Sequence, residues 1–383
     1  MRTYQSEKPI ILNPTNKQDW VLIRRLRKKS CVRIIDDFVE QVRELFLSRN
    51  PDLKMDPRRA YRLSQDLIKK SARSLEKTGN WIYFDWDQTL VHVLSKREYG
   101  ELRTARNRNL ISKSEQDSFR DFKVGIIGLS VGNSIALCIA LEGGCQSMRL
   151  ADHDNIALSN LNRIRGGARD LGLNKAVATA RQIYELNPYA NLEVWKNGVA
   201  EEELSRFLGG LNVVIDEMDD VILKLRLREE ARKMKIPVIS AADNGDNAVV
   251  DVERFDQEPE RKIYHGLLGR VDFDHLRKAT FQEQFDLINK MVGVQYVTSR
   301  MKKSLLLVGK KLYAWPQLGG AAFLSGSALT YVVRRMATGE DIPSGKYDVN
   351  LDRIFERNFD SPKRIKARRN ETKRFLESFR MKK

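Results

Sequence analysis

The most informative stretch of this 383-residue chain is LADHDNIALSNLNR, residues 150–163. It begins as an apolar strand, turns acidic at Asp152 and continues in a polar run that ends at Arg163. An acid at the end of the second strand of a dinucleotide-type fold can accept hydrogen bonds from ribose hydroxyls. Asp152 follows Gly128 by 24 residues, which is close to the spacing of about 20 in such folds. The stretch therefore predicts a nucleotide site at the end of a strand.

The glycine-bearing loop upstream, residues 128–132, allows three interpretations when it is taken alone. Its sequence is Gly-Leu-Ser-Val-Gly, and missing side chains let backbone N–H groups and a helix N-terminus approach a phosphate. The same letters fit the nucleophile elbow of a hydrolase, with Ser130 followed along the chain by Asp216 and then by His265 or His275. Small residues also allow a helix to pack closely on a sheet. A hydrolase has no use for Asp152 or for the polar run after it, so the second strand favours the phosphate loop.

Strand and helix patterns alternate from residue 122 onwards. Short apolar runs bounded by turn residues predict strands, and apolar residues at helical spacing predict helices. The predicted strands are 124–127, 148–151, 192–195, 213–215 and 237–240, and the predicted helices are 133–142, 174–186 and 223–234. This repetition predicts an α/β fold, a Rossmann-like and mostly parallel sheet with helices on both faces. Ligands in such folds bind at the carboxyl ends of the strands.

The chain divides into three parts by pattern. Residues 1–100 are expected to form a mainly helical N-terminal unit that could bind a peptide, residues 101–345 the α/β domain, and residues 346–383 a basic tail. In the first part, apolar residues from Ile35 to Phe46 predict a helix that stops at Asn50-Pro51. A second helix is expected from Asp56-Pro57 to about Lys77, followed by a strand at 81–84 and a charged connector at 96–120.

Composition bounds the class of protein. Hydrophobic residues make up 42% of the chain and charged residues 31%, which excludes a disordered or collagen-like protein. No apolar run reaches the roughly 20 residues that span a bilayer, and the N-terminus lacks a signal-peptide core. The three cysteines, Cys31, Cys138 and Cys145, form no CxxC pair, so neither a disulfide framework nor a zinc site is expected. We expect a cytoplasmic protein without a membrane segment.

The charge balance points to an acidic partner. The formal net charge is +17, and residues 361–383 hold ten Lys or Arg against two Glu. Such a segment is either a solvated tail or terminal helix, or a contact for an acidic partner. Nucleic acid is not the expected partner, because single-stranded RNA sites interleave aromatic residues and only Phe375 and Phe379 occur here.

The string D-x-D-x-x-x-x-S-N-L-x-R at residues 152–163 resembles the signature of the ThiF/MoeB/E1-like adenylating enzymes, which activate carboxylates with ATP. The resemblance extends over roughly residues 103–339. Further segments similar to motifs of that family are Arg106-Asn107-Arg108-Asn109, Gly172-Leu173-Asn174-Lys175, Ile215 to Asp220 and Leu318 to Gly339.

The resemblance implies a role for each matching position. Gly128, Ser130 and Gly132 would lie against the nucleotide, and Asp152 would bind the ribose. Within the polar run, Ser159, Asn160 and Arg163 would hold the triphosphate.

It also implies the groups closest to the reaction. Lys175 would neutralise charge near the α-phosphate, and Asp219 would hold Mg²⁺, although Asp216, Glu217 and Asp220 share its loop. Arg108 resembles the arginine that reaches the neighbouring subunit's site, which implies a homodimer. Arg163, Lys175, Asp219 and Arg108 are therefore the expected catalytic residues, with ATP and Mg²⁺ but no zinc.

The chain departs from the family at three places. Ser130 and Val131 replace glycines of the loop, and Ile164 replaces the usual glutamine after Arg163. No cysteine follows Cys145, so a thioester or persulfide step beyond the metal-site aspartate cannot occur.

A family member without that cysteine resembles the enzymes that mature ribosomally made peptides, such as those of microcin C7 and pantocin A. The expected function is adenylation of the carboxylate of an acidic peptide or small protein, with residues 256–315 as a substrate lid. The alternatives are adenylation of the C-terminus of a ubiquitin-like or sulfur-carrier protein, and a non-catalytic scaffold that binds nucleotide or nucleic acid.

Overall fold

The computed structural model describes residues 7–71, 75–269 and 272–380, and the chain divides into two compact units. The first unit comprises Met1–Arg120, Ala140–Gln146 and Ala180–Asn191. The second comprises Asp121–Ile139, Ser147–Thr179 and Leu192–Lys383. No helix in the described ranges combines the length and the apolar character that crossing a membrane requires.

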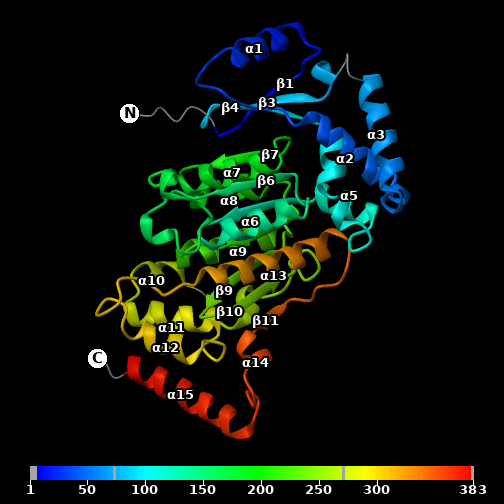
Figure 1. Ribbon diagram of the computed structural model, residues 1–383. Coiled ribbons are helices and arrows are strands. Elements are labelled where there is room, and N and C mark those ends of the chain that lie inside the picture. The colour runs from blue at the N-terminus through cyan, green and yellow to red at the C-terminus, as the bar shows by residue number, and fades with distance from the viewer. Residues whose placement is uncertain (1–6, 72–74, 270–271, 381–383) are drawn as a thin grey trace. The chain divides into compact units, whose positions relative to one another are not determined.

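The second unit is built on a seven-stranded sheet in the order β11-β10-β9-β8-β5-β6-β7 (Figure 1). Its strands are β5 (Lys123–Ile127), β6 (Ser147–Ala151), β7 (Asn191–Trp195), β8 (Val213–Asp216), β9 (Val238–Asn244), β10 (Asn247–Glu253) and β11 (Gly345–Val349). β5 pairs in parallel with β6 and β8, and β8 pairs in parallel with β9. β10 pairs antiparallel with both β9 and β11. The predicted Rossmann-like, mostly parallel sheet is confirmed.

Helices cover both faces of this sheet. The helices of the alternating region are α6 (Val131–Leu141), α7 (Lys175–Leu186), α8 (Leu204–Leu208), α9 (Val221–Lys233) and α13 (Gly319–Ala337). Neighbouring residues of a strand face opposite sides. In β5, a Cβ built on Gly125 would meet Phe207 of α8, whereas the side chain of Ile126 lies under Gly132 of α6. α6 and α8 therefore lie on opposite faces, and the predicted helices are confirmed to within about three residues.

The strand order reverses at β5, which lies between β6 and β8. The loops that follow β5 and β8 diverge to opposite sides of the sheet, and this is where such folds bind ligands. Because β5, β6, β8 and β9 are parallel neighbours, their carboxyl ends meet at one edge. We call this the carboxyl edge: residues 128–134 after β5, 152–163 after β6, 217–219 after β8, and the end of β9.

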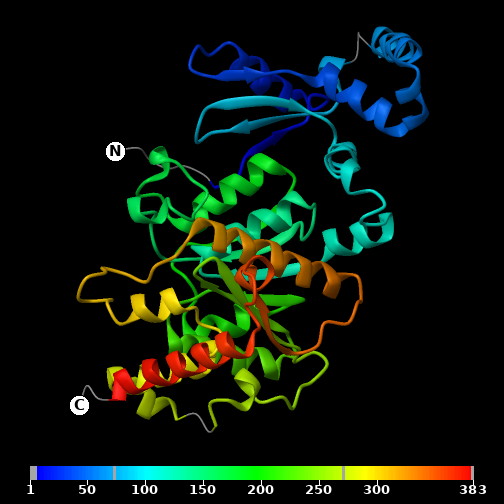
Figure 2. The same ribbon diagram turned by 60° about the horizontal axis from the view of Figure 1, so that its bottom comes forward.

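The C-terminal part of the second unit contains α10 (Phe273–Arg277), α11 (Phe281–Val292), α12 (Ser299–Leu305), α14 (Leu351–Phe355) and α15 (Pro362–Arg380). α15, red in Figures 1 and 2, lies against α12. Phe375 packs on Val294, Leu305 and Leu306, and Lys302 Nζ donates to Thr372 Oγ1 at 2.8 Å. The basic C-terminal segment thus forms a helix that packs on α12, and a contact with an acidic partner stays a prediction.

The first unit is helical by residue count but also contains a sheet. Its helices are α1 (Lys17–Arg27), α2 (Phe38–Arg49), α3 (Pro57–Ser71), α4 (Lys96–Arg103) and α5 (Lys113–Asp121). Its strands, β1 (Ile10–Leu12), β2 (Arg33–Ile35), β3 (Asn80–Phe84) and β4 (Thr89–Val93), form a sheet in the order β1-β3-β4-β2.

Two expected helices of this unit have other bounds in the structure, and three of its four strands were not predicted. The sequence predicted only the strand β3. Ile35 belongs to β2, so the helix α2 begins at Phe38. α3 ends at Ser71, before the predicted Lys77, with residues 72–74 outside the described ranges. The connector at 96–120 is largely helical. Strands of three residues are too short for a periodic signal, which explains why β1 and β2 were missed.

Candidate functional site

The glycine loop touches the loop after β8. Gly128 has φ +89°, and a Cβ there would lie 2.3 Å from the carbonyl oxygen of Glu217. The position therefore excludes any side chain both by backbone conformation and by space. Ser130 is half-buried just before α6, and Gly132 is buried in its first turn. The loop brings the N-terminus of α6 to the carboxyl edge, the arrangement that suits a phosphate.

The acid at the end of β6 fixes the loops on either side of it. Asp152 is 7% exposed, and its Oδ2 accepts the Leu129 N–H at 2.7 Å while its Oδ1 accepts the Asp154 N–H at 2.8 Å. Each oxygen keeps a second lone pair. The predicted ribose acid therefore lies next to the glycine loop with accepting capacity left. Asp152, His153 and Asp154 are also close enough to share a cation.

Lys175 points back to the polar run. Its Nζ lies 2.8 Å from Asp154 Oδ2, and its side chain is 7% exposed. The hydrogen bond from Lys175 holds the pKa of Asp154 below its ordinary value. Asn174 accepts the N–H groups of Ala176 and Val177 and so caps α7. The second acid of the motif thus holds the lysine in place.

The polar run closes on itself as a helical turn at Leu158–Asn160. Asn160 Oδ1 accepts the Ala157 N–H at 3.0 Å, and the Asn160 carbonyl accepts the N–H of Arg163 at 3.1 Å. Ser159 is exposed, and Asn160 and Arg163 are half-buried. Arg163 Nη1 donates to Asn162 Oδ1 at 2.9 Å. The turn therefore holds the three predicted triphosphate residues in one short segment.

Arg163 interacts electrostatically with two acids, one in β9 and one in the loop after β8. Burial lowers the pKa of Arg163, and the negative charges of Asp243 and Asp219 oppose that shift. Its Nε is buried and has no hydrogen-bond partner in the described part of the chain. Arg163, Asp219 and Asp243 therefore share one electrostatic environment, although the sequence places them in three separate segments.

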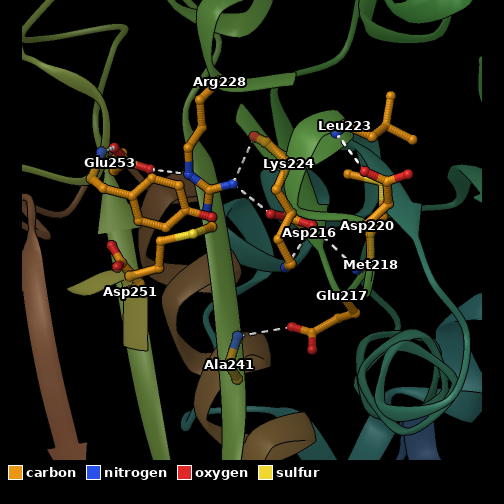
Figure 3. A network of polar contacts seen from close by, with 12 residues as sticks. Asp216, Glu217, Met218, Asp220, Leu223, Lys224, Arg228, Ala241, Asp251 and Glu253 are labelled. Atoms are coloured by element: carbon orange, nitrogen blue, oxygen red, sulfur yellow. Dashed lines mark hydrogen bonds and ion pairs between the residues drawn. The ribbon is translucent and has the colours of Figure 1, made fainter. Parts of the chain in front are cut away.

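The four acids after β8 have different surroundings, three of which Figure 3 draws. Asp216 is buried, and it accepts hydrogen bonds from Lys224 at 3.0 Å and Arg228 at 2.5 Å. Burial alone would raise the pKa of Asp216, but these two cations hold it below its ordinary value. Arg228 also donates to Glu253 at 2.6 Å. Asp216 is therefore part of a buried ion network.

The other three acids of this loop also differ in their hydrogen-bond partners. Glu217 accepts the Ala241 N–H at 2.8 Å, and burial raises its pKa well above the ordinary value. Asp220 accepts the Leu223 N–H at 2.9 Å and caps α9 (Figure 3). Asp219 is exposed and has no hydrogen-bond or ion-pair partner within the described ranges. Of the four carboxylates, Asp219 is the one with no hydrogen-bond or ion-pair partner within the described ranges, which makes it the most available to a ligand.

Asp243 at the end of β9 was not singled out from the sequence. Its Oδ1 accepts the Ser325 Oγ–H of α13 at 2.9 Å. Burial raises the pKa of Asp243 to about 6, against the opposing effects of Ser325 and Arg163. The turn signal Asn244-Gly245-Asp246-Asn247 that follows would have marked a strand end here.

Two further expectations concern the position of Arg108 and the hydrolase alternative. Arg108 belongs to the first unit, where its Nη2 lies 3.6 Å from Glu101 and its Nη1 donates to the Ser48 carbonyl at 3.3 Å. The hydrolase order fails because Asp216 pairs with Arg228, whereas His265 Nε2 lies 2.7 Å from Asp251.

Comparisons with known proteins show which family and which proteins this chain resembles. The ThiF family model matches residues 104–318. The uncharacterized protein MT1398 of Mycobacterium tuberculosis is 36% identical over 351 residues, 91% of this chain and 46% of that protein. The chain thus spans about half the length of this curated relative. The molybdopterin-synthase adenylyltransferase of Haemophilus influenzae is 29% identical over 167 residues, 42% of this chain and 68% of that enzyme. The structure of Escherichia coli MccB with ATP aligns with a TM-score of 0.47 at 14% identity, covering 82% of this chain and 84% of that one.

Proposed function

Because this chain belongs to the ThiF family, we propose that it activates a substrate carboxylate by adenylation. A carboxylate oxygen attacks the α-phosphorus of ATP, the bond to the β-phosphate oxygen breaks, and an acyl-adenylate and pyrophosphate result. The observation that carries the proposal is the common environment of Arg163 and Asp219 beside the glycine loop. The similarity to an enzyme named as an adenylyltransferase supports the same chemistry.

Different residues of the carboxyl edge bind different parts of ATP. The Gly128 loop brings backbone N–H groups to the phosphates without a side chain in the way. Asp152 accepts hydrogen bonds from the ribose hydroxyls. Asn160 and Arg163 bind the triphosphate, Arg163 with a planar fork that matches phosphate oxygens. Ser159 adds an exposed hydroxyl to the same turn.

Two charged residues act closer to the reacting phosphorus. Lys175 neutralises negative charge that develops at the α-phosphate, and Asp154 orients its ammonium group at 2.8 Å beforehand. Asp219 fits a magnesium site because hard cations bind one or two carboxylates together with phosphates and water, and its carboxylate has no other partner within the described ranges. Bound there, Mg²⁺ would neutralise the phosphate oxygens.

The acyl group then passes to a nucleophile of the substrate or of a second molecule. No cysteine follows Cys145 in this sequence, and burial raises the pKa of the Cys145 thiol above its ordinary value, which disfavours the nucleophilic thiolate. We therefore favour maturation of a ribosomally made peptide as the function. The net charge of +17 suits an acidic peptide. The N-terminal unit would bind this peptide, and residues 256–315 would close over it. Arg108 would complete the site of a second subunit in a homodimer.

The second candidate is adenylation of the C-terminus of a ubiquitin-like or sulfur-carrier protein. The name of the Haemophilus influenzae relative, a molybdopterin-synthase adenylyltransferase, is the observation in its favour. This candidate requires a partner protein ending in Gly-Gly, whereas the first requires a short acidic precursor.

Pyrophosphate exchange into ATP distinguishes these candidates. Wild type and Asp219→Ala are assayed with Mg²⁺, acidic peptides and Gly-Gly-terminated proteins in turn, and Asp220→Asn is the control for a neighbouring acid. Exchange that depends on one substrate class and is lost only in Asp219→Ala supports adenylation and identifies the class. A folded protein that binds no ATP refutes it and favours the non-catalytic scaffold. That scaffold predicts nucleic-acid binding with a steep salt dependence.

A further inference from the structure

Asp243 is an acid at the carboxyl edge that the proposed chemistry does not use. It belongs to β9, and only one of its carboxylate oxygens has a hydrogen-bond donor, the Ser325 hydroxyl at 2.9 Å. The other, Oδ2, is buried and has no partner in the described part of the chain. Buried carboxylate oxygens are almost always hydrogen-bonded. Oδ2 therefore lacks a donor that a ligand can supply.

The position of Asp243 relative to the other site residues suggests which part of a ligand it meets. Along the carboxyl edge the strands follow the order β6, β5, β8, β9. The ribose acid Asp152 follows β6, the glycine loop β5 and the metal acid Asp219 β8. A nucleotide bound in this order has its phosphates over β5 and β8. A group attached to the α-phosphate then extends towards β9, where Asp243 lies.

The negative charge of Asp243 makes this residue unsuitable for binding a second anion. Arg163 is the cation near Asp243, and their charges affect each other, although no ion pair is formed within 4.0 Å among the described residues. A carboxylate beside a triphosphate site repels the nucleotide unless a donor or a positive charge accompanies it. That donor must come from the acyl substrate, because Arg163 is committed to the phosphates.

We propose, on the basis of the adenylation function above, that Asp243 is a specificity-determining residue for the acyl substrate. Its Oδ2 accepts a hydrogen bond from a nitrogen donor on the carbon next to the activated carbonyl. The substrate class is thus a carboxylate with an adjacent N–H group, either an amino acid with its ammonium group or the C-terminal residue of a peptide with its amide N–H. Ser325 orients the carboxylate through Oδ1.

Stable acyl-adenylate mimics test this proposal without knowledge of the natural substrate. Glycyl-, N-acetylglycyl- and propionyl-sulfamoyl-adenosine share the nucleoside and the linker. The first has an ammonium group, the second an amide N–H, and propionyl replaces the ammonium group by a methyl group of the same size. Their dissociation constants are measured by calorimetry with the full chain. We expect wild type to bind the glycyl or the N-acetylglycyl mimic roughly 10- to 100-fold more tightly than the propionyl mimic, as a hydrogen bond to a charged group predicts.

Two variants assign the preference to Asp243. In Asp243→Asn the preference should fall to about threefold or less, because the charge is lost while the shape and the acceptor for Ser325 remain. Asp220→Asn removes the same charge from a residue that caps α9 and should keep the wild-type preference.

The outcomes separate this inference from the function on which it rests. Equal binding of all three mimics by wild type refutes the role of Asp243 and leaves adenylation intact, even if Asp243→Asn does not fold. A preference that persists in folded Asp243→Asn refutes it too. A folded wild type that binds neither ATP nor any mimic refutes the adenylation site itself.

Discussion

Replacing Gly128 by alanine tests whether the glycine loop and the loop after β8 must touch. Gly128 has φ +89°, and the new Cβ would lie 2.3 Å from the Glu217 carbonyl oxygen and 3.0 Å from the Met218 nitrogen. The left-handed conformation costs an alanine roughly 1–2 kcal/mol. Because the clashing atoms belong to the backbone, no side chain can rotate away, and overpacking adds about 1–3 kcal/mol. Gly210→Ala is the matched control, with φ +76° and no atom within 4 Å of its Cβ.

Urea unfolding and ATP titration measure the two consequences. We expect Gly128→Ala to lose about 2–4 kcal/mol of unfolding free energy and Gly210→Ala only about 1 kcal/mol, since alanine also restricts the unfolded chain. We expect ATP affinity to fall about tenfold or more in Gly128→Ala alone, the effect of losing one hydrogen bond to a charged phosphate. If Gly128→Ala is as stable as Gly210→Ala and binds ATP normally, the contact between the loops does not build the site.

Three further changes have defined outcomes. Arg228→Met removes the cation that pairs with buried Glu253 and leaves buried Asp216 with Lys224 as its remaining cation, and urea unfolding should show a loss of about 3–5 kcal/mol; a loss below 1 kcal/mol would contradict the buried network. Lys175→Met should lower the rate of pyrophosphate exchange by about 100-fold or more while the ATP dissociation constant changes little; an equal loss in both would make Lys175 a binding residue only. Asp243 has a folded-state pKa of about 6, so the folded state binds more protons than the unfolded state between about pH 4 and 6 and loses stability as the pH rises. The free energy of unfolding of Asp243→Asn, relative to that of wild type, should therefore be larger at pH 7.5 than at pH 5. A difference between the two proteins that is the same at both pH values would contradict this.

The second unit was predictable because its signals are local. β5 and β8 are mainly apolar strands of five and four residues, buried apart from Lys123. Gly128 follows β5 and Asp216 ends β8, and each marks the strand boundary. Such runs typify parallel strands covered on both faces. The hairpin of β9 and β10 was missed, although Gly245 has φ +69° in a two-residue turn. The two turn residues are Gly245 and Asp246, and glycine at the first position of a two-residue turn predicts a hairpin of this kind.

The sheet of the first unit was less predictable because its strands depend on distant partners. β1 and β2 have three residues each, and they pair with β3 and β4, which lie more than fifty residues away. Ile10, Ile11 and Ile34 remain exposed, at 43%, 39% and 40%, so the strands show no alternation between core and solvent. Their pairing is a tertiary effect that no pattern within three residues can indicate.

The acidic loop after β8 shows most clearly what the sequence cannot decide. Asp216, Glu217, Asp219 and Asp220 stand within five residues, and the sequence alone gives no reason to choose a metal ligand among them. Their partners make the difference, and these come from elsewhere: Arg228 lies 12 residues beyond Asp216, and the N–H that Glu217 accepts lies 24 residues away on β9. A carboxylate that already neutralises a buried cation cannot leave it without exposing an unpaired charge. The acids that the fold has already paired are thus less available to a ligand, and this is why we propose Asp219 as the residue that would hold Mg²⁺.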